Sequence, residues 1–258
     1  KEALAWGRRA AVDPEAVRKI AFPARPVPIE SARPKTLDEI VALRTQELTA
    51  YQNAAYAKRY ETFVGEVRAR EAEATPGETA IAEAVARNLF KLMAYKDEYE
   101  VARLYSDGKF MADLRRAFDG DYKMKIHLAP PLLAPRDPET GHLKKMTFGP
   151  WMFRAFRLLA RFKGLRGTWL DPFGKTAERK MERRLIGEYQ ATVRHVLSRL
   201  TPENHHAALE LASLPDDIRG YGHIKEAAVV AAKARETALL AEFDRPAGAP
   251  QPKRVAAE

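Results

Sequence analysis

Apolar residues recur every three or four positions along most of this chain, which is the spacing of one helix face. The clearest example covers residues 36–72, where Thr36 and Glu39 also carry the signature of a capping box at a helix start. Thr75-Pro76-Gly77 then interrupts the pattern, and a second helix is predicted over residues 78–105. Two helices joined by so short a break favour a long antiparallel helical hairpin.

The same spacing predicts helices in most of the remaining chain. These further helices cover residues 109–118, 150–163, 175–200, 202–213 and 222–243. Near the start, the pattern indicates the end of one helix and a second short helix that begins at Asp13-Pro14.

One segment, at about residues 121–148, departs from the helical period and alternates apolar with polar residues, as a half-buried strand does. The apolar positions of its first strand run from Tyr122 to Leu128, and a second run at 143–148 follows a proline-rich turn. The polar face of the first strand is basic and consists of Lys123, Lys125 and His127. Solvation explains such a face; contact with another domain or an anionic ligand is the alternative. The predicted fold class is mainly α, a helical domain with a long helical hairpin and one small antiparallel two-stranded ribbon.

The chain divides into four parts by composition. Residues 1–20 are expected to end a preceding domain, and residues 21–35 form a proline-rich linker. Residues 36–243 form the helical domain with the ribbon, and residues 244–258 form a disordered tail. Because Lys1 lies within a helical pattern and no initiator Met precedes it, we expect a fragment of a longer protein.

Helix 150–163 is apolar around most of its circumference, which is typical of a buried helix. Its cationic stripe consists of Arg154, Arg157 and Arg161. We therefore expect the helix to be buried and each arginine to be paired, because an unpaired buried charge is costly. Pairing with acids such as Asp171 or Glu178 is the first interpretation. A phosphate or carboxylate site and a membrane-surface helix are the alternatives.

Composition bounds the chemistry. The chain has 258 residues, of which 46% are hydrophobic and 31% charged, and its net charge of +9 favours anionic partners. It contains no cysteine, which excludes disulfides, thiolate zinc sites and cysteine-ligated iron–sulfur clusters within this chain. No apolar run approaches the ~20 residues of a membrane span. A cytoplasmic location is expected.

Familiar catalytic motifs are missing, including the P-loop, the glycine-rich dinucleotide motif and the nucleophile elbow. "FDGDYK", residues 118–123, is similar to part of a thiamine-diphosphate motif but lacks its downstream Asn pair, so a turn entering a strand explains it better. Arg219 and His223 flank a Gly-Tyr-Gly turn at a predicted helix N-terminus, where free N–H groups can bind an anion; a simple cap explains them as well. We predict no catalytic residue and no metal site.

Four long blocks of the chain carry a resemblance: "YKDEYEVARLYSDGKF", "FDGDYKMKIHLAPPLLA", "KKMTFGPWMFRAFRLLARFKGLRGTWLDPFGKTAERKMERRLIGEY" and "LPDDIRGYGHIKEAAV". They are similar to the C-terminal region of a known family, the large single-chain indolepyruvate:ferredoxin oxidoreductases of aerobic bacteria. "ALAWGRRAA", residues 3–11, resembles the closing helix of the preceding gamma-type catalytic domain. The resemblance covers most of residues 1–243.

The resemblance implies a parent enzyme that oxidatively decarboxylates an aryl 2-oxoacid and passes the acyl group to coenzyme A. Thiamine diphosphate with Mg and iron–sulfur clusters would carry this chemistry elsewhere in the parent, and ferredoxin would accept the electrons. The segment alone is expected to be inactive. Its expected partners are the remaining domains of a homo-oligomeric parent, with ferredoxin as a further candidate.

Two other classes of function stay open. One is an interaction module that holds the parent's domains or its oligomer together without touching the chemistry. The other is a stand-alone basic helical module that binds an acidic protein or nucleic acid. Nucleic acid is the weaker of these two partners, because clustered Lys and Arg with stacking aromatics are missing.

Overall fold

The computed structural model describes residues 2–21, 36–118, 120, 123–129, 135 and 144–245. Within these residues lie 11 α-helices and one antiparallel two-stranded sheet, which confirms the predicted fold class. The chain forms two compact units, residues 1–35 and residues 36–258. None of the described helices is long and apolar enough to cross a membrane.

The first unit contains two short helices, α1 (Glu2–Val12) and α2 (Pro14–Ala21). The side chain of Asp13 accepts a hydrogen bond from the backbone N–H of Ala16 at 2.9 Å and so caps α2. The short helix predicted at Asp13-Pro14 is therefore confirmed. The proline-rich linker falls on residues 22–35, and the predicted disordered tail falls largely on residues 246–258; both stretches lie outside the described residues.

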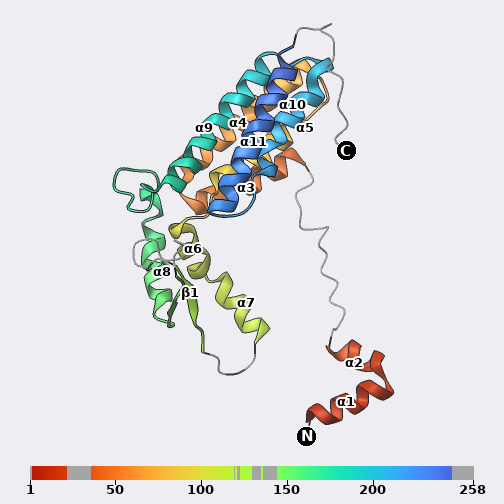
Figure 1. Cartoon of the computed structure of the whole chain (residues 1–258), viewed down its shortest axis with the longest axis vertical. Coiled ribbons are helices and arrows are strands. Elements are labelled where there is room, and N and C mark those ends of the chain that lie inside the picture. The colour runs from red at the N-terminus through yellow and green to blue at the C-terminus, as the bar shows by residue number, and fades with distance from the viewer. Residues whose placement is uncertain are drawn as a thin grey trace. The chain divides into compact units, whose positions relative to one another are not determined.

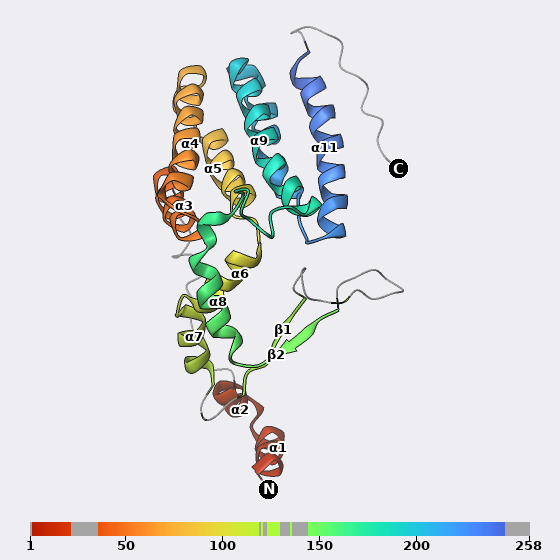
Figure 2. The same cartoon turned by 90° about the vertical axis from the view of Figure 1, so that its left-hand side faces the viewer.

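Six helices of the second unit lie side by side as a bundle, as Figures 1 and 2 show for the longest of them. They are α3 (Leu37–Tyr51), α4 (Ala54–Ala74), α5 (Ala80–Met93), α9 (Ala177–Ser198), α10 (His205–Ser213) and α11 (His223–Phe243). Helix α5 is central, because it packs on α3, α4, α9 and α10. Its apolar residues, such as Val85 and Leu89, are completely buried. The predicted capping box of Thr36 and Glu39 is present at the start of α3.

The hairpin is formed by α4 and α5, and each predicted arm is divided in two. The helix predicted over residues 36–72 breaks where Asn53 caps the start of α4, and the helix predicted over residues 78–105 breaks where Asp97 caps α6 (Glu98–Ser106). Each cap is a side-chain oxygen that accepts a backbone N–H at 2.8 Å. Neither break contains Gly or Pro, and the helical spacing of apolar residues continues across both. The sequence pattern therefore predicted one helix where the structure has two.

A smaller layer stands at one end of the bundle, where Figure 2 shows α8, α7 and α6 beside the ribbon. Its elements are α6, α7 (Lys109–Ala117), β1 (Ile126–Leu128), β2 (Met146–Phe148) and α8 (Met152–Arg161). The two strands pair antiparallel, with Ile126 opposite Phe148, and are shorter than the sequence predicts. The remaining short elements are the 3-10 helices η1 (Lys163–Leu165), η2 (Pro202–Asn204) and η3 (Leu214–Asp217).

Candidate interaction surface

Helix α8 packs one face against the other described residues. Phe156 is 5% exposed and forms a small core with Ala102 of α6 and Ile126 of the ribbon. The ring of Tyr105 stacks on that of Phe156 with centroids 5.4 Å apart. Leu159 packs at the edge of this core and is half-buried. The ribbon's apolar side and α6 together therefore cover the inner face of α8.

The opposite face of α8 is open, and the expectation of a fully buried helix with paired arginines is wrong. Three arginines are exposed and have no hydrogen bond or ion pair with another described residue: Arg154, Arg157 and Arg161. The acids suggested as partners are used elsewhere, because Asp171 accepts backbone N–H groups of Gly167 and Phe173, and Glu178 pairs with Arg179. Among the described residues, α6, the ribbon and Phe110 of α7 cover one side of the helix.

Large apolar side chains also lie on the open side. Trp151, Leu158 and Phe162 are 59%, 56% and 47% exposed. At about 100° per residue they form a stripe roughly 90° around the helix from the arginines. We call these six residues the α8 outer face. Its mixture of tryptophan, phenylalanine and arginine is the composition enriched in the centres of protein–protein interfaces.

The segment after α8 attaches this layer to the bundle through the end of α3. The ammonium group of Lys163 donates to the carbonyl oxygens of Thr49 and Ala50, and Arg166 donates to that of Tyr51 at 2.7 Å. These carbonyls belong to the last turn of α3, where the helix itself supplies few donors. Burial, with Arg103 nearby, lowers the pKa of Lys163.

Arg166 also binds the start of α6 through Asp97. Both side chains are almost completely buried, at 2% and 3% exposed, and the two hydrogen bonds measure 2.5 and 2.9 Å. The guanidinium carbon lies 3.5 Å from the ring centroid of Tyr51. Burial opposes the charge of Arg166, but the hydrogen bonds to Asp97 prevail and the pKa of Arg166 is raised. We call Arg166, Asp97 and Tyr51 the Arg166 clamp; it fixes the connection after α8 to two helix ends.

The connection from α8 to α9 is ordered by a second carboxylate. Asp171, which is buried, accepts the hydroxyl of Tyr99 at 3.3 Å and two backbone N–H groups of its own loop. Between these fixed points the loop carries two exposed apolar residues, Trp169 at 81% and Leu170 at 52%. The loop is fixed by buried side chains at two places and still exposes a tryptophan between them. It therefore adds to the exposed apolar surface near α8.

The remaining sequence-predicted cations fall on other elements. Those of the ribbon are exposed, and they alternate with inward residues as predicted: Lys123, Lys125 and His127. His127 lies 3.1 Å from the hydroxyl of Thr147 on the paired strand. Arg219 donates to the carbonyl of Asp216, and His223 is the first residue of α11. The candidates thus lie in three separate places, and the roles of the three ribbon cations, of Arg219 and of His223 stay predictions.

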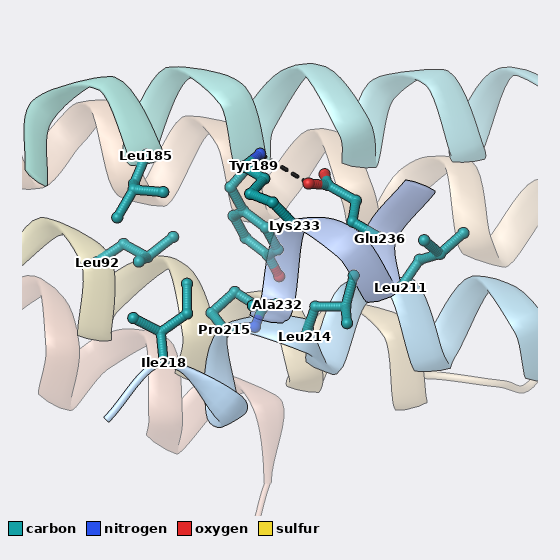
Figure 3. Close-up of a pocket in the computed structure, with 10 residues that line it drawn as sticks. All are labelled: Leu92, Leu185, Tyr189, Leu211, Leu214, Pro215, Ile218, Ala232, Lys233 and Glu236. Atoms are coloured by element: carbon teal, nitrogen blue, oxygen red, sulfur yellow. Dashed lines mark hydrogen bonds and ion pairs between the residues drawn. The ribbon is translucent and has the colours of Figure 1, made fainter. Parts of the chain in front are cut away.

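A small cavity lies inside the bundle between α5, α9, α10 and α11, as Figure 3 shows. Its volume is about 30 Å³, and most of its lining is apolar. The hydroxyl of Tyr189 donates to the carbonyl of Ala212 at 2.6 Å, and Lys233 pairs with Glu236 at 2.7 Å, the dashed line in the figure. Such a volume holds about one water molecule, so this is a packing gap rather than a ligand site.

Fold and surface together define a helical domain that exposes a basic, aromatic helix face. The chain belongs to a family of unknown function (DUF6537), which matches residues 37–238. The match includes the α8 outer face and the Arg166 clamp. No curated protein and no solved structure matches the chain.

Proposed function

We propose that this chain is an accessory, non-catalytic docking segment of an oxidoreductase of the indolepyruvate:ferredoxin type. The α8 outer face is its contact with the remaining domains of that enzyme. Support for the type of enzyme comes from the sequence blocks that resemble this family. Support for the docking role comes from the structure, and one observation carries it.

That observation is the contrast between the composition of α8 and its packing. The sequence of the helix is apolar on nearly all sides, as in a buried helix, yet the described part of the chain covers the inner face and leaves the outer face exposed. The outer side chains Trp151, Leu158 and Phe162 are each about half exposed. A second polypeptide seated on this face would bury them, and its carboxylates would pair with the three arginines.

A protein partner suits this surface better than a membrane or nucleic acid. The face is shared between arginines and aromatic residues, and the more continuous apolar side of α8 is already occupied by α6 and the ribbon. A membrane-surface helix would instead offer its most apolar side to lipid. The partner is therefore expected to present acidic residues around an apolar centre.

The chemistry of the enzyme would take place outside this chain. Thiolate ligands for iron–sulfur clusters must come from elsewhere, because all 258 residues lack cysteine. Thiamine diphosphate with magnesium, and the coenzyme A site, are likewise assigned to the parent's other domains. We propose a cytoplasmic, homo-oligomeric parent, in keeping with soluble ferredoxin as the acceptor.

The test is the charge reversal Arg154→Glu with Arg157→Glu, made both in this chain and in the full-length enzyme. In the chain alone the Tm should stay within about 1–2 °C, because exposed unpaired charges usually change stability by less than about 0.5 kcal/mol. In the full-length enzyme the same change should lower the Tm by several degrees and reduce indolepyruvate-dependent ferredoxin reduction. The matched control reverses Lys109 and Arg115 on α7, which are also exposed and have no ion pair with a described residue.

Equal, small effects of the α8 and α7 variants in the full-length enzyme would contradict docking. If the rate of the variant depends less steeply on ferredoxin concentration at low salt, and its Tm is unchanged, then the face binds ferredoxin instead. A further arm reverses Lys123 and Lys125 to test the ribbon. A raised KM for coenzyme A in that variant would place the ribbon at the coenzyme A site. Unchanged kinetics and assembly would mean that the ribbon has a structural role only.

A further inference from the structure

A second, larger cavity has a different character from the apolar gap in the bundle. Its volume is about 250 Å³, and it lies between the corner of α3 and α4, the connection from α5 to α6, and one face of α9. Its ten lining residues include three arginines and no acidic residue. The arginines are Arg59, Arg166 and Arg183.

Only one of the three guanidinium groups forms an ion pair with a described acid. Arg166 is paired with Asp97 in the clamp. Arg59 is exposed and has no ion pair with a described residue; its guanidinium lies 5.7 Å from the ring centroid of Tyr56. Arg183 donates from Nη2 to the carbonyl of Gly174 at 2.7 Å, but its Nη1 is buried without a hydrogen-bond partner. The cavity wall therefore carries an excess of positive charge, and Arg59 has no ion pair with a described residue.

Neutral donors complete the wall. Tyr95 lines the cavity and is 4% exposed. Burial raises the pKa of Tyr95 and outweighs the opposite effect of Arg183, so its phenol stays protonated at neutral pH and can donate. Gln52, which follows α3, and Gln190 of α9 also line the cavity.

We propose that this cavity binds a phosphate group, either as inorganic phosphate or as part of a small phosphorylated molecule. A phosphate dianion carries more charge and more acceptor oxygens than a carboxylate, which suits a wall that contains several arginines and no acidic residue. The volume accommodates the phosphate and a short organic group but not a drug-sized ligand. The site is independent of the α8 outer face, and the proposal does not rest on the docking function.

The experiment is a calorimetric titration of this chain with inorganic phosphate, with acetate at the same ionic strength as the comparison, and the Tm followed in parallel. Phosphate should bind saturably and raise the Tm, whereas acetate should do neither. Arg59→Gln should weaken phosphate binding by about 10-fold or more, the usual effect of losing a charged hydrogen bond. The matched control is Arg115→Gln on α7, which removes an exposed arginine far along the sequence and should leave binding unchanged.

A further variant blocks the cavity without removing any charge. Gly187 of α9 lines the cavity, and a Cβ atom placed there would meet open space. Gly187→Leu should therefore abolish phosphate binding while helix propensity keeps the fold intact. Equal responses to phosphate and acetate, or phosphate binding unchanged in both Arg59→Gln and Gly187→Leu, would overturn the proposal.

Discussion

Removing the buried charge of the Arg166 clamp should destabilise the second unit strongly. Arg166→Met keeps the apolar stem of the side chain but deletes three charged hydrogen bonds, two to Asp97 and one to the carbonyl of Tyr51. The carboxylate of Asp97 then stays buried, with the backbone N–H of Glu100 as its remaining donor among the described residues, at 2.8 Å. The cost arises mainly from this stranded charge.

The magnitude follows from the burial of the pair. Removing one member of a buried ion pair costs about 3–5 kcal/mol, and the 2% and 3% exposure of these side chains places the clamp in that class. Asp97→Asn keeps an oxygen that can cap α6, so its separate cost should be smaller. The double variant should cost less than the sum, with a coupling free energy of about 2 kcal/mol, since neither charge is then stranded.

The assay is urea unfolding at neutral pH, followed by circular dichroism. The free energies of unfolding are compared between variants that share the same dependence on urea concentration, the m-value. The control is Arg68→Met, because Arg68 pairs with Asp38 at a similar 2.6 Å but both side chains are more than half exposed. That change should cost less than about 1 kcal/mol. A cost below about 1 kcal/mol for Arg166→Met as well would refute the view that burial makes this pair indispensable.

The two faces of α8 should respond differently to truncation in this chain: Phe156→Ala should cost about 3–5 kcal/mol, and Leu158→Ala less than about 0.5 kcal/mol, in the same urea assay. Glu71→Ala should cost about 3 kcal/mol or more, because its completely buried carboxylate accepts two backbone N–H groups at the start of α5, each at 2.8 Å; a cost typical of surface sites would contradict this. Burial, only partly offset by Arg179, raises the pKa of Glu98, so the folded state disfavours its ionised form. That penalty is absent below the ordinary Glu pKa and complete above the raised one, so the stability of Glu98→Gln relative to wild type should increase from pH 4 to pH 7; a decrease would show the opposite sign.

Most of the helical fold could be predicted because each amphipathic helix buries a stripe that the sequence displays. The two missed breaks differ in how visible they were. Asp97 followed by Glu100 has the spacing of a capping signature, so the start of α6 could have been predicted from the sequence. Asn53 offers a weaker signal, since asparagine is common on helix surfaces as well as at caps.

The site was harder to predict, for a physical reason. Apolar periodicity indicates which residues avoid water in the functional state, but not which polypeptide covers them. Helix 150–163 was therefore expected to be buried within this chain, while the structure leaves Leu158 and Phe162 open. The Arg166 clamp was missed because its partners lie 69 and 115 positions away in sequence. No local pattern encodes such a contact.

Docking through the α8 outer face is tested most directly by hydroxyl-radical footprinting of side chains, read by mass spectrometry. The chain alone is compared with the full-length enzyme, and Tyr221, which is 67% exposed on a different element, serves as the internal reference. We predict that oxidation of Trp151, Leu158 and Phe162 falls several-fold in the full-length enzyme while that of Tyr221 changes little. Equal oxidation of the three residues in both proteins would contradict the docking function.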